Sequence, residues 1–88
     1  MKLLATARFL KSIPLPRRAE VLEAMKAASV AYGKPHLHAG VGLRRIPPFM
    51  ECRSGLDLRL IFQREDKNLV FHLCGTHDEV QSFLKNQR

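Results

Sequence analysis

The sequence predicts an α+β domain with the element order βααβββα, in which an antiparallel sheet carries an N-terminal helical hairpin and a C-terminal helix. Residues 56–64 and 69–74 alternate between apolar and polar side chains, as strands with one buried face do. Residues 17–32 carry apolar side chains at the spacing of a helix that packs on a sheet. The 88 residues are the size of one domain, so we expect residues 1–88 to fold as a single unit.

The first half of the chain predicts one strand followed by two helices. Residues 1–5 are short and apolar and predict an edge strand, and residues 6–12 predict a short helix that prolines then end. The second helix, over residues 17–32, stops at Gly33, because glycine commonly follows the last helical residue. Residues 34–42 predict a plain loop. His36 and His38 in this loop are too few for a zinc site, which needs three or four ligands.

The second half predicts the rest of the sheet and a closing helix. Residues 42–46 predict a short basic strand, and extended structure resumes over residues 49–53 before a turn. The two alternating strands then form a hairpin with a charged loop. The spacing of Thr76 and Glu79 is that of a capping box, which predicts a helix from there to about Lys85. We expect the helices to cover one face of the sheet, which leaves the other face free to bind.

The chain is strongly basic, with 15 lysines and arginines against 8 acidic residues and a net charge of +7. This excess favours a polyanionic partner, either a nucleic acid or an acidic protein. Cys52 and Cys74 lie in apolar strand-like runs without zinc-finger spacing, which predicts buried thiols in a reducing cytoplasm. No apolar run approaches the roughly 20 residues of a membrane span, so we expect a soluble, cytoplasmic protein with no membrane partner.

Five polar residues are candidates for a catalytic site on the free face, namely Arg53, Asp57, Arg59, His77 and Gln81. Strand alternation puts Asp57 and Arg59 on the face opposite the leucines, and His77 begins the last helix one turn before Gln81. Guanidinium groups bind phosphate through two parallel hydrogen bonds, and a histidine transfers protons near neutral pH. The combination predicts chemistry on a phosphodiester. No paired carboxylates with metal spacing occur in the sequence, so we expect no metal and no cofactor.

Each of these residues also has a purely structural interpretation. Arg59 could be an ordinary solvated residue of its strand. Arg53 could pair only with Glu51 or Asp57, and such a surface pair contributes roughly 0–1 kcal/mol. The capping box accounts for the local sequence around His77 without any catalytic role. The patterns alone therefore leave both interpretations open.

Four short pieces carry a family resemblance, namely LRLIF at 58–62, NLVFHL at 68–73, GTH at 75–77 and DEVQ at 78–81. Together with the helical hairpin predicted within residues 7–28, they resemble the RelE/ParE superfamily of toxins from type II toxin–antitoxin systems. The likeness is closest to the RelE/YafQ-like mRNA interferases and implies a microbial RNase-like fold.

The resemblance implies a ribosome-dependent mRNA endoribonuclease, in which the mRNA 2′-hydroxyl attacks the adjacent phosphate by acid/base chemistry without a metal. Arg59 matches the strand arginine of RelE-like members, and His77 is similar to the C-terminal histidine of YafQ-like members. Arg53 and Asp57 match polar positions of that branch. The RNA backbone would be bound by Lys34, Arg44 and Arg45. The implied partners are a small acidic antitoxin, mRNA in the ribosomal A site and, through the antitoxin, operator DNA.

Two departures from the family pattern keep other functions open. Gln81 stands where many active members have tyrosine or phenylalanine, and it cannot stack on a base as a ring does. The lysines of RelE proper correspond here to Met50 and Cys52. The alternatives are a ParE-like DNA gyrase inhibitor and a catalytically inactive interaction protein on the same fold.

Overall fold

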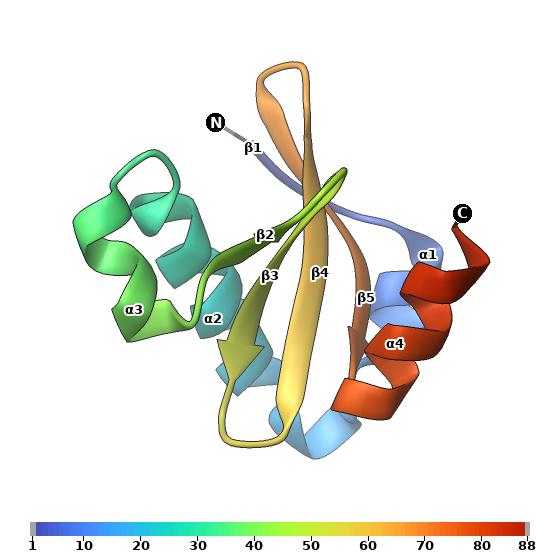
Figure 1. Cartoon of the computed structure of the whole chain (residues 1–88). Coiled ribbons are helices and arrows are strands. Elements are labelled where there is room, and N and C mark those ends of the chain that lie inside the picture. Colours follow the sequence, from blue (N-terminus) through green and yellow to red (C-terminus); the bar gives the residue numbers. More distant parts are fainter. Residues whose placement is uncertain (1, 88) are drawn as a thin grey trace.

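A computed structural model describes residues 2–87 and confirms the predicted α+β class (Figure 1). Its elements are β1 (Lys2–Ala5), α1 (Ala7–Ser12), α2 (Arg18–Ala31), α3 (His38–Val41), β2 (Arg44–Ile46), β3 (Phe49–Ser54), β4 (Leu58–Glu65), β5 (Asn68–Gly75) and α4 (His77–Asn86). Short 3-10 turns at Leu15–Arg17 and Pro35–Leu37 precede α2 and α3. The predicted first strand is present from its second residue, and residue 1 lies outside the described residues.

Two segments differ in detail from what the sequence predicts. The segment expected to be a plain loop contains a 3-10 turn and the short helix α3, which ends at Gly42 with a φ of 63°. The basic segment before the prolines is the separate strand β2, which pairs antiparallel with β3. Four strands therefore follow the N-terminal helices, where the predicted order has three.

The five strands form one sheet in the order β1-β5-β4-β3-β2. The pairings among β2, β3, β4 and β5 are antiparallel, as predicted. β1 instead pairs with β5 in parallel, with Lys2 opposite Asn68 and Ala5 opposite Phe71. Parallel neighbours need a long crossover connection, and here the helices and the other three strands provide it.

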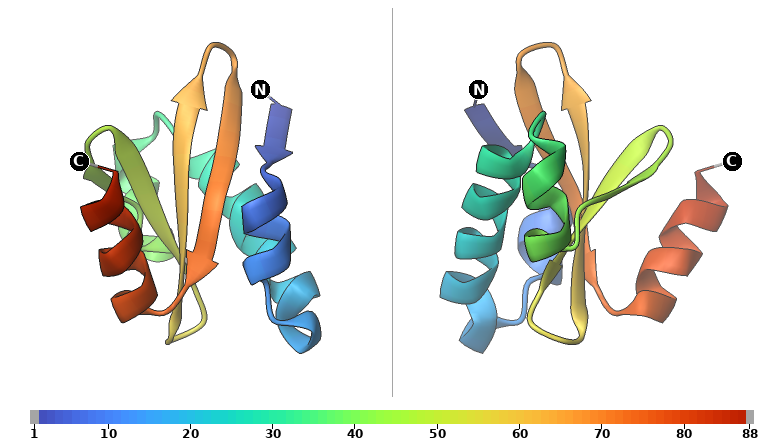
Figure 2. Two further views of the ribbon diagram at one scale, coloured as in Figure 1. Left: turned by 90° about the vertical axis from the view of Figure 1, so that its right-hand side faces the viewer. Right: turned by 60° about the vertical axis from the view of Figure 1, so that its left-hand side comes forward.

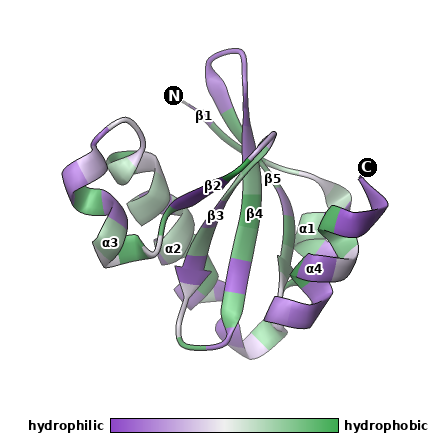
Figure 3. Ribbon diagram, in the orientation of Figure 1, coloured by the Kyte–Doolittle hydropathy of each residue, from purple (hydrophilic) through white to green (hydrophobic). Residues whose placement is uncertain are grey.

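One face of the sheet packs against α1 and α2 (Figure 2). The main residues of this core are Phe9, Val21, Met25, Ala28, Leu58, Leu60, Phe62 and Phe71. In α2 the buried residues follow the predicted helical spacing, and in β4 they follow the predicted alternation. Figure 3 shows the same division along the chain, with mostly hydrophobic residues in β4 and β5 and hydrophilic residues in β2.

The opposite face of the sheet is not open, which corrects the prediction that all helices lie on one side. α4 lies across this face (Figure 2), and its Val80 and Phe83 pack on Phe49 and Ile61 in a second buried cluster. The physical reason is that β3 and β4 carry apolar side chains on both faces, so both faces need cover from water. α4 covers only part of this face and leaves a cleft beside the β2–β3 hairpin.

Candidate functional site

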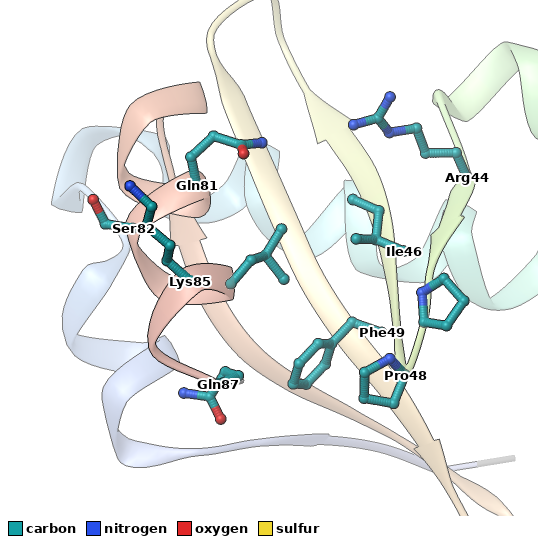
Figure 4. A pocket seen from close by; sticks show the side chains of 10 residues that line it. Arg44, Ile46, Pro48, Phe49, Gln81, Ser82, Lys85 and Gln87 are labelled. Atoms are coloured by element: carbon teal, nitrogen blue, oxygen red, sulfur yellow. The ribbon is translucent and has the colours of Figure 1, made fainter.

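The cleft between α4 and the β2–β3 hairpin has a volume of about 410 Å³ (Figure 4). Phe49 and Leu84 give it an apolar lining, and its rims are polar. Arg44 on β2 and Gln81 on α4 lie on opposite sides, with Lys85 one turn after Gln81 (Figure 4). An apolar cleft with a few cationic and amide groups can accommodate bases and bind phosphates.

A buried carboxylate beside the cleft contacts two arginines, of which Arg44 lines the cleft and Arg59 does not. The side chain of Glu51 on β3 is only 1% exposed, and its Oε1 accepts a hydrogen bond from Arg59 Nη1 at 3.0 Å. The same oxygen lies 3.2 Å from Arg44 Nε. The register explains this contact, because Arg44 is the cross-strand partner of Glu51. A guanidinium has five N–H donors, so both arginines keep donors for a ligand.

Arg53 adds a third guanidinium to the same face. It pairs directly with Arg59 across β3 and β4, so the two side chains leave the sheet on one side. The Arg53 stem lies over Gly42, where a Cβ would be 2.8 Å from Arg53 Cγ, and the positive φ there also favours glycine. Like charges directly opposite one another destabilise a sheet, so the arginine pair indicates a place for an anion.

The sequence interpretation did not name Glu51 as a site residue, although a signal for it was present. Glu51 has the same strand parity as Arg53 and lies between Met50 and Cys52 in an otherwise mostly apolar strand. Its Oε2 is buried without a hydrogen-bond partner in the described residues, and buried polar atoms in native folds are nearly always hydrogen-bonded to protein or to water. Met50 and Cys52 pack on the α2 side, so lysines at these two positions would not face the cleft.

His77 is the first residue of α4, and its position follows from the end of β5. Gly75 pairs with Arg59, and Thr76 then caps the helix through the predicted capping box. His77 therefore lies two residues beyond the partner of Arg59, and its side chain is exposed. Gln81 follows one turn later on the same side of α4, because residues four apart lie one above the other.

Asp57 does not join this group, which corrects the expectation that it shares a face with Arg59. It lies in the β3–β4 turn, and both carboxylate oxygens accept hydrogen bonds from Arg17 Nη1 at 2.7 Å. Arg17 Nη2 also donates to Glu20 Oε2 at 2.7 Å. Hydrogen bonding to Arg17 lowers the pKa of both Asp57 and Glu20. Asp57 is thus part of a bridge from the turn to the start of α2.

The three residues expected to bind the RNA backbone lie apart from one another. Arg44 lines the cleft, whereas Arg45 points to the other side of β2, because successive strand residues alternate. Arg45 lines a second hollow there. Lys34 is exposed in the connection after α2 and lines neither of these two hollows. Only Arg44 therefore belongs to the group around Glu51.

Other kinds of site are not found in the described part of the chain. Within residues 2–87, no three histidine, cysteine, aspartate or glutamate side chains gather as a metal-binding group. Cys52 and Cys74 are free and buried, and burial raises the pKa of their thiols to about 12 and about 11, so neither is a nucleophile at neutral pH. No helix over the same residues has the length and apolar character to cross a membrane.

No protein-family model matches the sequence, and no curated protein matches it. Solved structures do match it, and a toxin and a toxin–antitoxin complex are among them. YafQ from E. coli strain BL21(DE3) has a TM-score of 0.62 at 19% identity, over 90% of this chain and 96% of that one. A chain of the E. coli DinJ–YafQ toxin–antitoxin complex has a TM-score of 0.61 at 19% identity, over 90% and 94%. A copper-bound mutant toxin from Helicobacter pylori has a TM-score of 0.56 at 19% identity, over 91% and 98%.

The chain therefore has the fold of E. coli YafQ along nearly its whole length, which agrees with the fold that the sequence resemblance implies. At about one identical residue in five, this likeness concerns the path of the backbone. The roles of individual side chains have to be argued from the cleft of this chain itself.

Proposed function

We propose that this protein is the toxin of a type II toxin–antitoxin system and acts as a ribosome-dependent mRNA endoribonuclease. The observation that carries the proposal is a set of three arginines on one face of the sheet: buried Glu51 contacts Arg44 and Arg59, and Arg53 lies directly opposite Arg59. His77 comes two residues after Gly75, the cross-strand partner of Arg59 on β5, and the fold is that of the YafQ toxin. Three guanidiniums and one carboxylate (3 − 1) leave this group with a net charge of +2, which favours a phosphodiester over a neutral ligand.

In the proposed mechanism, Arg53 and Arg59 hold the scissile phosphate. The mRNA 2′-hydroxyl attacks the adjacent phosphorus, and the bond to the 5′-oxygen of the next nucleotide breaks. The products are a 2′,3′-cyclic phosphate and a 5′-hydroxyl. Negative charge builds up on the phosphoryl oxygens in the transition state, and donors already oriented toward it lower the barrier. Glu51 supplies that orientation, since it holds Arg59 at 3.0 Å before any substrate binds.

His77 would transfer the proton in this reaction. A neutral imidazole would accept the proton of the 2′-hydroxyl, and an imidazolium would donate one to the leaving 5′-oxygen. The pH profile separates the two roles, because cleavage that depends on His77 rises with pH for the base and falls with pH for the acid. Gln81, one turn further along α4, would hydrogen-bond a base edge or a phosphate oxygen beside the cleaved bond.

The partner of the proposed toxin would be a small acidic antitoxin. E. coli YafQ, whose fold this chain shares, has been crystallised in a complex with DinJ. The net charge of +7 favours association with an acidic chain. The substrate would be mRNA in the ribosomal A site, and operator DNA would be contacted through the antitoxin.

A second candidate function is inhibition of DNA gyrase, as in the ParE branch. Gln81 favours it, because the cleft has an amide where many nucleases of the superfamily have a ring. The absence of the RelE lysines is weaker support for gyrase inhibition than the sequence alone indicates. Met50 and Cys52, which stand at those positions, pack on the α2 side and do not face the cleft. A third candidate, an inactive interaction protein, would keep the partner and lose both activities.

Primer extension on a reporter mRNA in a translating lysate tests the proposed nuclease. The wild type should cut the translated mRNA at discrete sites, and Arg59→Ala and His77→Ala should each reduce cleavage by about 100-fold or more. Arg18→Ala and His36→Ala are the matched controls, because both side chains are exposed and lie outside the cleft. Equal cleavage by every variant, or none by the wild type, contradicts the assignment.

A DNA supercoiling assay with purified gyrase separates the second candidate from the first. Inhibition at micromolar protein together with intact mRNA would establish the gyrase inhibitor. Neither activity, with no growth arrest when the protein is induced, would indicate the interaction protein.

A further inference from the structure

A second hollow of about 430 Å³ lies on the other side of the β2–β3 hairpin from the cleft. Arg45 on β2 and Arg64 on β4 line it, together with Tyr32 and His38 from the α2 and α3 side. The cleft and this hollow share one wall, formed by residues 47–49 at the turn of the hairpin. A linear polymer that occupies the cleft therefore reaches the second hollow by crossing this turn.

The hollow carries positive charge that no nearby carboxylate neutralises. Neither Arg45 nor Arg64 takes part in an ion pair within residues 2–87. Arg64 donates from Nε to the carbonyl oxygen of Asp66 at 3.0 Å, which restrains its side chain and leaves its terminal nitrogens free of that bond. Both arginines are exposed. Two guanidiniums on one hollow, one of them restrained, are suited to bind phosphate.

An aromatic ring beside the arginines favours a nucleic acid over an acidic protein segment. The guanidinium carbon of Arg64 lies 6.0 Å from the centroid of the Tyr32 ring, and Tyr32 is half-buried. Surfaces for single-stranded nucleic acid combine such rings, on which bases stack, with cationic groups that follow the backbone. An acidic peptide would use the charges but would gain little from the ring.

We propose that the second hollow binds a nucleotide of the same RNA strand that occupies the cleft and whose scissile phosphate lies at Arg53 and Arg59. The strand crosses the proline turn of the β2–β3 hairpin, with Arg44 on one side and Arg45 on the other. Arg45 and Arg64 bind its backbone phosphates, and a base lies near Tyr32. This inference rests on the proposed RNA substrate and adds a second site, which one RNA strand fills together with the cleft only if it is long enough to cross the hairpin turn.

Fluorescence anisotropy with fully 2′-O-methylated oligonucleotides tests this proposal, because the methyl group removes the attacking hydroxyl and the readout is binding alone. A trinucleotide can occupy only one of the two hollows at a time, whereas a nonanucleotide is long enough to span both. For the double variant Arg45→Ala/Arg64→Ala we expect about tenfold weaker binding of the nonanucleotide and at most about twofold for the trinucleotide, which still has the cleft. The slope of log affinity against log salt should fall by about 1.4 for the nonanucleotide, about 0.7 for each lost phosphate contact.

Two control variants make the comparison specific. Arg44→Ala should weaken both oligonucleotides, because Arg44 lines the cleft. Arg18→Ala should weaken neither, since Arg18 is exposed on α2 outside both hollows. Circular dichroism of each variant verifies the fold before binding is compared.

Three results would overturn the inference. In the first, the wild type binds both oligonucleotides with equal affinity. In the second, the double variant loses as much affinity for the trinucleotide as for the nonanucleotide. In the third, the double variant loses affinity for an acidic peptide and keeps its affinity for both oligonucleotides. Failure of the proposed nuclease is distinguishable, because primer extension would then show no cleavage while the length-dependent RNA binding remained.

Discussion

Replacement of Glu51 by alanine tests the organisation of the cleft most directly. Removing one partner of a buried ion pair typically lowers stability by about 3–5 kcal/mol, because the other charge stays desolvated. Here the Arg59 side chain is 22% exposed and that of Arg44 59% exposed with Glu51 in place, so water can solvate both and offset part of the loss. We therefore expect Glu51→Ala to lower the free energy of unfolding by about 2–3 kcal/mol. For a domain of this size that is about 10–20 °C in melting temperature.

The variant Glu51→Gln separates stability from catalysis. The amide keeps the shape of the side chain and one acceptor for Arg59, and it no longer has to be buried as a charge, so stability should change by less than about 1 kcal/mol. Arg59 would be held less firmly, and cleavage should fall about tenfold or more. Affinity for methylated RNA should not fall, because the cleft loses a negative charge.

Urea unfolding followed by circular dichroism, together with primer extension and anisotropy, measures these three quantities. Glu23→Ala is the control, because the Glu23 side chain is 75% exposed and lies 3.5 Å from Lys26, and such surface pairs contribute little. The reasoning is refuted if Glu51→Ala unfolds like the wild type, or if Glu51→Gln cleaves mRNA at the full rate.

Positions outside the cleft give further tests. Gly55→Ala should lower stability by about 1–3 kcal/mol in calorimetry, because φ is 69° and its Cβ would lie 2.5 Å from Arg17 Nη2; an unchanged melting temperature contradicts this. Arg17 lowers the pKa of Asp57 in the folded protein. Their interaction therefore stabilises the fold fully above the pKa that Asp57 has in the unfolded chain, and this stabilisation is lost as pH falls through the pKa of Asp57 in the folded protein. Arg17→Ala should thus flatten the rise of the urea midpoint with pH below about pH 5, and parallel curves for the two proteins count against the bridge. The thiols of Cys52 and Cys74 have pKa values of about 12 and about 11. They should react with a thiol reagent at about pH 8 only after the protein unfolds, and rapid labelling of the native protein would show that they are not buried as described.

Strand alternation is sufficient to predict part of the cleft and fails where the strand ends. It correctly puts Arg53 and Arg59 on one face, because both lie within paired strands. It is wrong for Asp57, because that residue precedes β4 and turn residues do not continue the alternation. Leu56, assigned to the buried face by the same rule, is fully exposed. The partner of Asp57 is Arg17, 40 residues away in sequence, and no local pattern indicates it.

The last helix shows a second limit of local patterns. The capping box and the apolar spacing of Val80 and Phe83 predict that α4 exists and which of its faces is buried. They do not specify which face of the sheet receives it, and that choice decides whether a binding face stays open. Ile61, an apolar residue on the expected free face, was the available sign that this face would be covered.

The charges of the cleft argue for an anionic ligand independently of the likeness to YafQ. Arg53 and Arg59 lie directly opposite one another, an arrangement that destabilises a sheet, and the single charge of Glu51 is shared between Arg59 and Arg44. Proteins retain such unfavourable local arrangements mainly where function requires them. A ligand that binds only the folded state raises the free energy of unfolding. The gain grows with the logarithm of the ratio between the ligand concentration and the dissociation constant. A phosphodiester between the two arginines would therefore relieve their repulsion, and this argument rests on the side chains of this chain and not on a fold shared at 19% identity.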